Sequence, residues 1–320
     1  MSALATPRRK LAIPWADVVL VALLATAFIT MSLLSPNFLT LSNLLEVTRF
    51  SGEVGLLALG MTLVIITGGI DLSVGAILGL SGIALGMLTA AGINIWLAAA
   101  LTLTLGTLLG AFNGLVISRI GIPPLIVTLA TMAIFRGFSL GLSQARSFGE
   151  FPEGFFALGQ GYVLGLPTQL LVLIALAIAI AFLLNRHAIG RLIYAVGNNA
   201  TAARFAGAPV GLALVIVYAI SGALSSIAGL VYTARLSSAR ADAGIGFELD
   251  AITAVVLGGT AIMGGSGNIL GTMLGLVLVG VIRNGLTLAF VPTEQQAIII
   301  GLTLLVAVLS DQFLRHRSKS

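Results

Sequence analysis

Few residues in this chain could carry out covalent or metal chemistry. Cysteine is absent, so the sequence offers no thiol nucleophile, disulfide or thiolate metal site. His187 and His316 lie far apart, and no paired carboxylates or nucleophile–base combination is visible. Lysine occurs only at Lys10 and Lys319, and no phosphate-binding Gly-x-x-x-x-Gly-Lys-Ser/Thr run exists. We therefore expect no enzyme, no metal site and no cofactor bound by this chain; ATP and Mg²⁺, if they drive it, belong to a partner.

One long polar segment, 185–211, separates two apolar blocks and carries three arginines and a histidine but no acidic residue. A basic island of this kind favours the cytoplasmic face of a membrane. Asn198 or Asn199 can cap a short helix there, and Gly207 and Pro209 would end it. Its small residues would let a partner approach closely; the alternative is a helix that only lies on the membrane surface. The contact candidates are Asn199, Thr201, Ala202, Ala203, Arg204 and Gly207.

Other glycine, polar and charged residues interrupt the apolar stretches. Gly68 and Gly69 precede Asp71, whose carboxylate can cap the following helix or, near a membrane, relay protons or ions. Arginines within apolar spans can extend their side chains to water, or they can line a pathway or an interface. The hinge or pathway candidates are Gly68, Gly69, Asp71, Asn113, Arg136, Gly258, Gly259, Arg283 and Asn284.

Charged residues in two further segments offer a docking surface for a soluble partner, because charges steer encounter and fix register. The alternative is that they only keep the surface hydrated. The docking candidates are Arg146, Glu150, Arg235 and Arg240.

The composition places all these residues in a membrane protein. Hydrophobic residues make up 58% and charged residues 8%, whereas a soluble domain carries about 25% charged residues. The 39 glycines suit close helix packing in lipid. No basic run is longer than Arg8-Arg9-Lys10, so the net charge of +5 indicates topology rather than nucleic-acid binding. The apolar run from Ala16 to Leu34 is longer than a signal-peptide core of about 7–15 residues, so we expect an uncleaved first span.

We expect ten membrane-spanning helices, since a span needs about 20 apolar residues. The apolar run from Val54 to Ala91 would measure roughly 57 Å as one helix, so it must turn, and Gly68–Asp71 is where it can. Residues 264–268 join the eighth and ninth spans in the same way. The expected spans are about 16–34, 51–67, 72–91, 94–117, 125–143, 169–184, 212–234, 249–264, 269–290 and 295–312.

The distribution of basic residues predicts the orientation of these spans. With the N-terminus inside, ten lysines and arginines fall in inside segments, four in outside segments and two within spans, which accounts for the 16 present. The sequence thus predicts an all-α polytopic membrane protein with a single transmembrane domain over residues 1–320 and both termini cytoplasmic.

Four strings in order resemble the permease subunits of bacterial ribose-type sugar importers of the ATP-binding-cassette class. They are Ile66–Gly75, the Ala202-Ala203-x-x-x-Gly207 pattern, Phe247–Gly259 and Gly264–Thr272. The family's coupling motif reads Glu-Ala-Ala-x-x-x-Gly, and Thr201 stands in this chain where that glutamate would be.

This resemblance implies a channel-forming subunit in the bacterial inner (plasma) membrane. It implies a second permease copy or paralogue, cytoplasmic ATPase subunits docked on the coupling segment, and an extracytoplasmic sugar-binding protein. It assigns no sugar site in this chain. The stretch from Phe135 to Glu153 looks more like rhamnose-type than ribose-type permeases, and permeases for the furanose autoinducer are also similar. The substrate expectation is therefore a monosaccharide or a sugar-like polyol.

Two other function classes compete with this interpretation. An ion-coupled secondary sugar transporter would also need broken helices near the membrane midplane; against it, no expected span has a central acidic residue, since Asp71 falls at an expected turn. A membrane enzyme would need catalytic groups that the sequence lacks.

Overall fold

A computed structural model describes residues 15–317, which form a bundle of α-helices with one short hairpin. Residues 1–14 and 318–320, which contain the chain ends, lie outside this range, so the expected cytoplasmic position of both termini stays a prediction. The helices are α1 (Trp15–Leu34), α2 (Leu41–Ile66), α3 (Val74–Ala90), α4 (Ile95–Ile120), α5 (Pro124–Ser143), α6 (Glu153–Gln160), α7 (Thr168–Arg186), α8 (Ala188–Phe205), α9 (Val210–Leu236), α10 (Phe247–Leu257), α11 (Ile269–Leu288) and α12 (Thr293–Arg317). The hairpin pairs β1 (Tyr162–Val163) with β2 (Leu166–Pro167).

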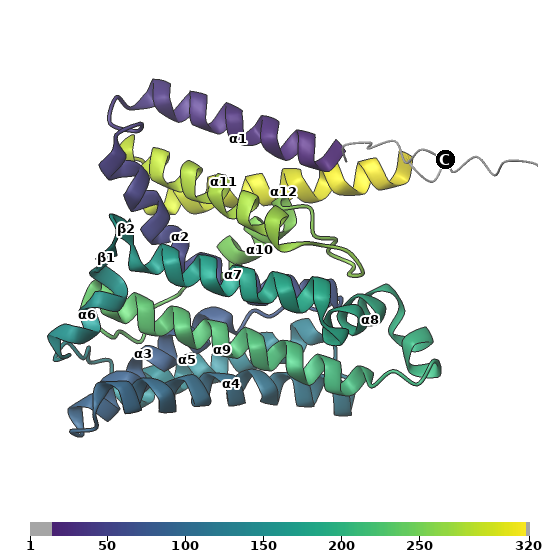
Figure 1. Ribbon diagram of the computed structural model, residues 1–320, viewed down its shortest axis with the longest axis horizontal. Coiled ribbons are helices and arrows are strands. Elements are labelled where there is room, and N and C mark those ends of the chain that lie inside the picture. The colour runs from purple at the N-terminus through teal and green to yellow at the C-terminus, as the bar shows by residue number, and fades with distance from the viewer. Residues whose placement is uncertain (1–14, 318–320) are drawn as a thin grey trace, which may run out of the picture.

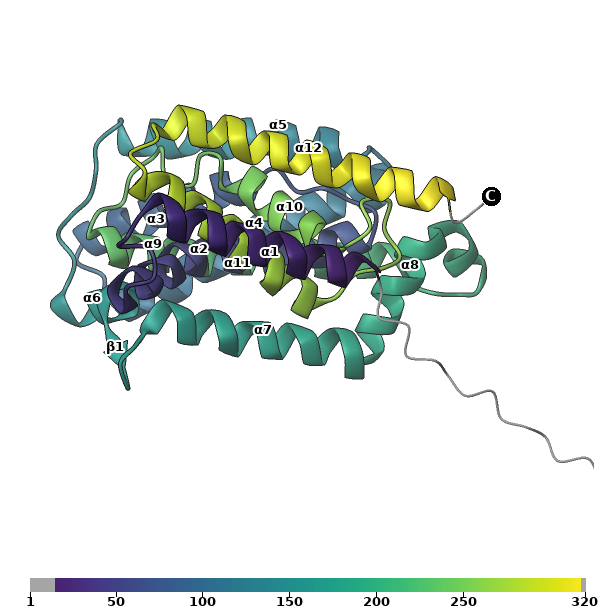
Figure 2. The ribbon, with the colours of Figure 1, turned by 90° about the horizontal axis from the view of Figure 1, so that it is seen from above.

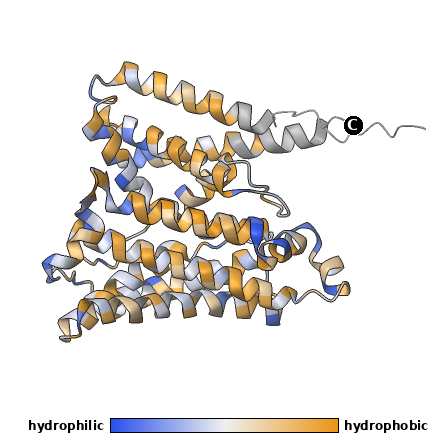
Figure 3. Cartoon of the chain, viewed as in Figure 1, coloured by the Kyte–Doolittle hydropathy of each residue, from blue (hydrophilic) through white to orange (hydrophobic). Residues whose placement is uncertain are grey.

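The long helices run roughly side by side between two ends of the molecule (Figure 1). The α6 end carries α6 and the hairpin, and the α8 end carries α8. Hydrophobic residues cover most of the helices, whereas the strongly hydrophilic ones gather mainly near the two ends (Figure 3). The arrangement confirms the all-α membrane class expected from the composition.

Five helices of the described chain, α4, α5, α7, α9 and α11, are long and apolar enough to cross a membrane. The two parts of α2, Leu41–Arg49 and Ser51–Ile66, are bent by 40° and make a sixth if counted together. Each of the ten expected spans contains a helix. The number of crossings and their orientation nevertheless stay predictions, because helix length and composition alone do not place a membrane.

The eighth expected span, 249–264, is wrong as a continuous helix. α10 ends at Leu257, and residues 258–268 form a turn in which Gly259, Gly264 and Gly265 adopt positive φ. The helix has 11 residues, so it measures about 16 Å, roughly half of a hydrocarbon core. The apolar residues beyond Leu257 could not reveal this, because hydropathy does not distinguish an apolar turn from a helix.

Close glycine contacts hold the centre of the bundle together. α2 is buried on every side from Val54 to Ile66 and packs against α7, α9, α10 and α11. α4 and α9 approach so closely that a Cβ on Gly110 would lie 2.1 Å from the carbonyl oxygen of Tyr218. A Cβ on Gly222 would lie 2.2 Å from the carbonyl oxygen of Gly106. This confirms the expectation that glycine permits close helix packing.

Candidate functional site: the coupling segment and the polar interior

The segment 185–211 is helical for most of its length but contains a break. α8 runs from Ala188 to Phe205, and Asn199 within it has non-helical angles, φ −162° and ψ 96°. The Oδ1 atom of Asn199 accepts a hydrogen bond from the backbone N–H of Ala202 at 2.8 Å. Asn199 therefore caps a second short helix, as the sequence predicted, and Gly207 ends it with φ +81°.

Most of the contact candidates on this second helix point outward. Thr201, Ala202, Arg204 and Gly207 are exposed, as is Asn199, and Phe205 beside them is 89% exposed. Ala203 differs, because it is buried in a small cluster with residues of the chain itself. Ala203 therefore packs against its own bundle and offers no contact surface, and the opposite face of the helix is exposed.

The first part of α8 rests on both glycine strings. The N–H of Gly265 donates to the carbonyl of Ile66 at 2.9 Å, which ties the two turns together. A Cβ on Gly197 of α8 would lie 1.7 Å from that same carbonyl oxygen and 2.7 Å from the nitrogen of Gly265. The hydroxyl of Tyr194 donates to the carbonyl of Gly267 at 2.8 Å. The first part of α8 is thus in direct contact with the turns after α2 and α10.

Asp71 lies inside the bundle, not at a surface turn. It is fully buried, and its Oδ1 accepts from the N–H of Ser73 at 3.0 Å and from the Ser73 hydroxyl at 2.6 Å. Its Oδ2 accepts from the hydroxyl of Ser221, near the middle of α9, at 3.0 Å. Asn113 of α4 donates to the Ser73 hydroxyl at 2.9 Å. Asp71 therefore lies in the break between α2 and α3, as the sequence predicted, but this break is buried among the helices.

A second buried carboxylate, Asp250, lies in the first turn of α10. The Nη2 atom of Arg283 in α11 contacts both of its oxygens at 2.7 Å. Arg283 therefore turns inward to a buried partner and does not extend to water. Its neighbour Asn284 exchanges hydrogen bonds with Asn43 of α2 at 2.9 and 2.8 Å. These two candidates are residues of a helix interface.

Arg136 of α5 holds a segment made of successive backbone turns. Its Nη1 atom donates to the carbonyls of Ala241 and Ala243 at 2.9 and 2.7 Å. The segment lies along the glycine face of α3, where a Cβ on Gly75 would come within 2.4 Å of the Gly244 carbonyl oxygen. A Cβ on Gly79 would come within 2.9 Å of the Ala243 carbonyl oxygen. Sequence reasoning missed this stripe, although the spacing of Gly75, Gly79, Gly82 and Gly86 on one helical face could have indicated it.

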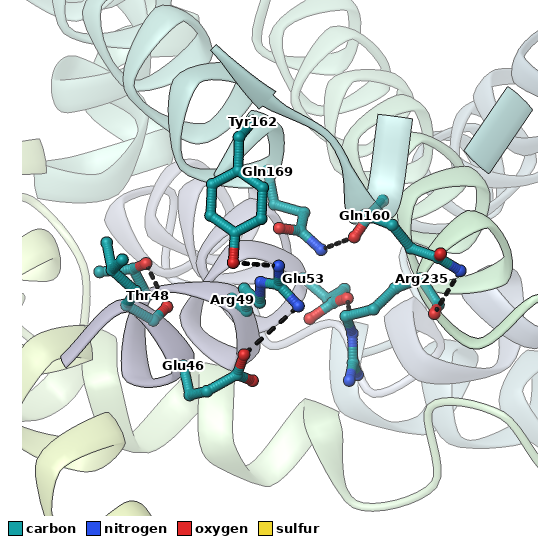
Figure 4. Close-up of polar contacts among 10 residues, drawn as sticks. Glu46, Thr48, Arg49, Glu53, Gln160, Tyr162, Gln169 and Arg235 are labelled. Atoms are coloured by element: carbon teal, nitrogen blue, oxygen red, sulfur yellow. Dashed lines mark hydrogen bonds and ion pairs between the residues drawn. The ribbon is translucent and has the colours of Figure 1, made fainter. Parts of the chain in front are cut away.

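A cluster of charged and polar side chains crosses the α6 end (Figure 4). The Nε atom of Arg235 donates to Glu53 Oε1 at 2.7 Å, and Glu53 is fully buried. Arg49 pairs with Glu46 at 3.3 Å and donates to the hydroxyl of Tyr162. The cluster joins α2, α9 and the hairpin. Arg235 thus lies in the last turn of α9, not on the segment after it, and its partner is buried; its part in docking stays a prediction.

The remaining docking candidates lie on two linked segments. Phe148 and Ala239 form a backbone bridge, with hydrogen bonds of 3.0 and 2.8 Å, which joins the segment after α5 to the segment after α9. Beside it, Arg146, Arg240 and Asp242 line an open surface hollow of about 410 Å³. Arg240 makes two hydrogen bonds to Asp242 and so lowers the pKa of that exposed carboxyl.

Glu150 is exposed on the first of these two segments, but it is not among the residues that line the hollow. Elsewhere in the part of the chain that the structure describes, no group of three or more His, Cys, Asp or Glu could hold a metal ion.

The comparisons with known proteins agree with this architecture. Residues 43–308 match the family described as "Branched-chain amino acid transport system / permease component". The chain belongs to this permease family. It is accordingly a multi-pass protein of the bacterial inner membrane. No solved structure matches it.

Curated relatives cover nearly the whole chain. The ribose import permease protein RbsC of Haemophilus influenzae is 39% identical over 288 residues, which are 88% of this chain and 89% of the relative. The ribose import permease of Bacillus subtilis is 42% identical over 286 residues, 89% of each chain. The autoinducer 2 import system permease protein LsrD of Klebsiella pneumoniae is 38% identical over 314 residues, 96% of this chain and 94% of the relative.

Proposed function

We propose that this chain is the channel-forming subunit of an ATP-binding-cassette importer that carries a monosaccharide or a sugar-like polyol into the cell. The observation that carries this proposal is the exposed, capped helix after Asn199, seated on the glycine turns that follow α2 and α10. The relatives named for ribose and autoinducer 2 import support the substrate class. The family description names branched-chain amino acids, so the substrate must be tested directly.

The proposal assigns ATP and Mg²⁺ to separate ATPase subunits at the α8 end, which is then cytoplasmic. An extracytoplasmic sugar-binding protein docks at the α6 end, and a second copy or paralogue of the permease completes the channel. A reporter fused after Gln160 should then lie outside the membrane and one after Asn199 inside.

Uptake into vesicles tests the function itself. Vesicles that carry the permease with its cognate ATPase and binding protein should accumulate labelled sugar only when ATP is present. A non-hydrolysable ATP analogue should stop uptake, and ionophores should not. The opposite pattern, block by ionophores alone, would establish the ion-coupled alternative.

Gly207→Asp tests the coupling surface. Gly207 has φ +81° and no atom within 4 Å of its would-be Cβ, so the new side chain points into the space where the ATPase groove would lie. We expect normal membrane insertion but loss of ATPase co-purification and uptake. Gly92→Asp is the matched control, because Gly92 has φ +83° and equally open surroundings at the α6 end. Equal loss in both variants would indicate backbone strain and contradict the coupling role.

Arg146→Glu with Arg240→Glu tests the docking surface. Both side chains line the same hollow, so reversal should repel an acidic patch on the binding protein and slow delivery when the binding protein is scarce. The defect should deepen as salt is lowered, because screening weakens. Uptake that stays normal at every binding-protein concentration and ionic strength would exclude this surface.

A further inference from the structure

The start of α10 lies well inside the bundle. From Ser237, at the α6 end of α9, the chain runs inward along α3, held first by the bridge at Ala239 and then by Arg136 at Ala241 and Ala243. At Gly244 it meets the first turn of α3 at Gly75. The first turns of two helices, α3 and α10, thus come together between the two ends of the bundle.

This inner junction is open on one side. Ile245 and Leu249 are 63% and 53% exposed, and Arg136 and Glu248 are half-buried. Arg136 is close enough to Glu248 and Asp242 for electrostatic interaction with both. The Glu248 carboxylate accepts a hydrogen bond from the N–H of Gly246 at 3.2 Å through Oε1.

Two helices border this junction, because α5 packs against α3 and α12 packs against α10. In Figure 2, α5 and α12 lie along the same edge of the bundle. In Figure 1, α12 lies above α10 and α5 lies below it. The junction between α3 and α10 is therefore flanked by α5 and α12, opposite the edge that α7 forms in Figure 2.

Partly exposed charges at this depth are incompatible with a face covered by lipid. A charged side chain at the centre of a bilayer costs about 2.5–3.5 kcal/mol on insertion scales, and such residues face the bundle interior or a water-filled cavity. Arg136 and Glu248 are neither fully enclosed nor at an end of the bundle. We propose that water covers this face, and that Arg136, Glu248 and the turn before α10 form a contact site for a neutral polyhydroxylated solute on its way through the membrane. This inference rests on the proposed importer function.

The chemistry of the junction selects the class of solute. Both hydrogen bonds of Arg136 to the chain come from Nη1, which leaves Nε and Nη2 to donate to a solute oxygen. Glu248 Oε2 can accept from a neighbouring hydroxyl. The positive charges of Arg136 and Arg240 balance the negative charges of Glu248 and Asp242, so the junction does not favour an anion or a cation. A donor and an acceptor side by side, with no net preference for either sign of charge, suit adjacent hydroxyl groups on a sugar or polyol.

The absence of cysteine from the chain makes the aqueous face directly measurable. In vesicles that carry the complete importer, Ile245→Cys and Leu249→Cys should react with a membrane-impermeant thiol reagent about tenfold faster than Ile178→Cys, since the thiolate forms only in contact with water. Ile178 is a matched control, because it is 65% exposed in the middle of α7 on the opposite edge. Rates equal to that of Ile178→Cys would overturn the proposal.

Glu248→Gln tests the contact with solute. The glutamine oxygen can still accept from Gly246, so the turn is kept while the carboxylate is lost. We expect uptake to fall about tenfold, as for a lost hydrogen bond to a charged group, with binding-protein-stimulated ATP hydrolysis unchanged within a factor of about two. Glu294→Gln, an identical change at an exposed position of α12, should leave both activities normal.

Two results of the Glu248→Gln experiment would overturn the solute contact. Unchanged uptake would show that the carboxylate does not touch the solute, and equal loss of uptake and ATP hydrolysis would show a structural role. Failure of the wild-type importer to take up sugar with ATP would instead refute the proposed function, so the two failures are distinguishable.

Discussion

Asp71 and Asp250 are two buried carboxylates beside the starts of two helices that meet inside the bundle, yet they are stabilised in different ways. Asp71, just before α3, accepts hydrogen bonds from Ser73 and Ser221. Asp250, in the first turn of α10, is paired with the guanidinium of Arg283. The difference teaches that a buried carboxylate need not indicate an ion pathway, since either neutral hydrogen-bond donors or a fixed cation can stabilise it.

The comparison also explains what couples the two helices to the rest of the bundle. Asp71 is hydrogen-bonded to Ser221 of α9, and Ser73 beside it is hydrogen-bonded to Asn113 of α4. Asp250 pairs with Arg283 of α11, and the nearby Phe247 packs edge-on against Tyr232 of α9. The start of α3 is therefore fixed by hydrogen bonds to α4 and α9, whereas the start of α10 is fixed by an ion pair to α11 and an aromatic contact with α9.

Arg283→Leu should produce the largest effect. Removing the guanidinium leaves the Asp250 carboxylate buried and unpaired, which costs about 3–5 kcal/mol. Thermal unfolding of the purified permease in detergent should show a correspondingly large loss of stability. Adding Asp250→Asn to this variant should recover more than half of the loss. A double variant as unstable as the single one would show that the pair itself is not the cause.

Asp71→Ala should cost less, about 1.5–3 kcal/mol, because it removes the charged acceptor of several hydrogen bonds without leaving a charge unpaired. Asp71→Asn should recover most of the stability, since the hydroxyls of Ser73 and Ser221 can rotate to suit an amide. The same detergent assay measures both. If Asp71→Asn abolished ATP-driven uptake without loss of stability, the negative charge of Asp71 would be needed for transport. Asp71 would then be more than a residue held by neutral hydrogen-bond donors.

Gly75→Ala tests the contact between the two helix starts. The added methyl would lie 2.4 Å from the Gly244 carbonyl oxygen, so the backbone must shift at a cost of about 1–2 kcal/mol. Gly137→Ala is the control, because nothing lies within 4 Å of its would-be Cβ on α5. A loss of stability in the control equal to that in Gly75→Ala would remove close contact as the explanation.

Asp242→Asn should have the smallest effect. Its partner Arg240 is 58% exposed and Asp242 is 54% exposed, and exposed pairs are worth about 0–1 kcal/mol. The unfolding temperature should therefore stay close to that of the wild type. A loss comparable to that of Arg283→Leu would mean that this pair anchors the segment before α10 as strongly as Arg283 anchors Asp250.

Local signals predicted well the parts of the site that depend on neighbouring residues. Asn199 caps its helix and Gly207 takes a positive φ, because capping and glycine conformation involve atoms only a few residues apart. The length of α10 was not predictable in this way. The turn at 264–268 was expected, but residues 258–263 consist of glycine, threonine and apolar residues, and whether such a stretch is a helix or a turn depends on what packs against it.

The sequence by itself determined that this protein is an apolar helical bundle with a basic, capped polar segment at 185–211, and its ordered glycine–acid strings identified the permease family. Hydropathy, periodicity and capping suffice for this, because they act within one helix. Only the tertiary structure decided which distant residues bond to Asp71, Asp250 and Glu53, since Ser221, Arg283 and Arg235 are far from them in sequence. It also decided that the segment before α10 packs on the glycine face of α3. A glycine in the sequence does not show which backbone lies against it, and only the folded chain does.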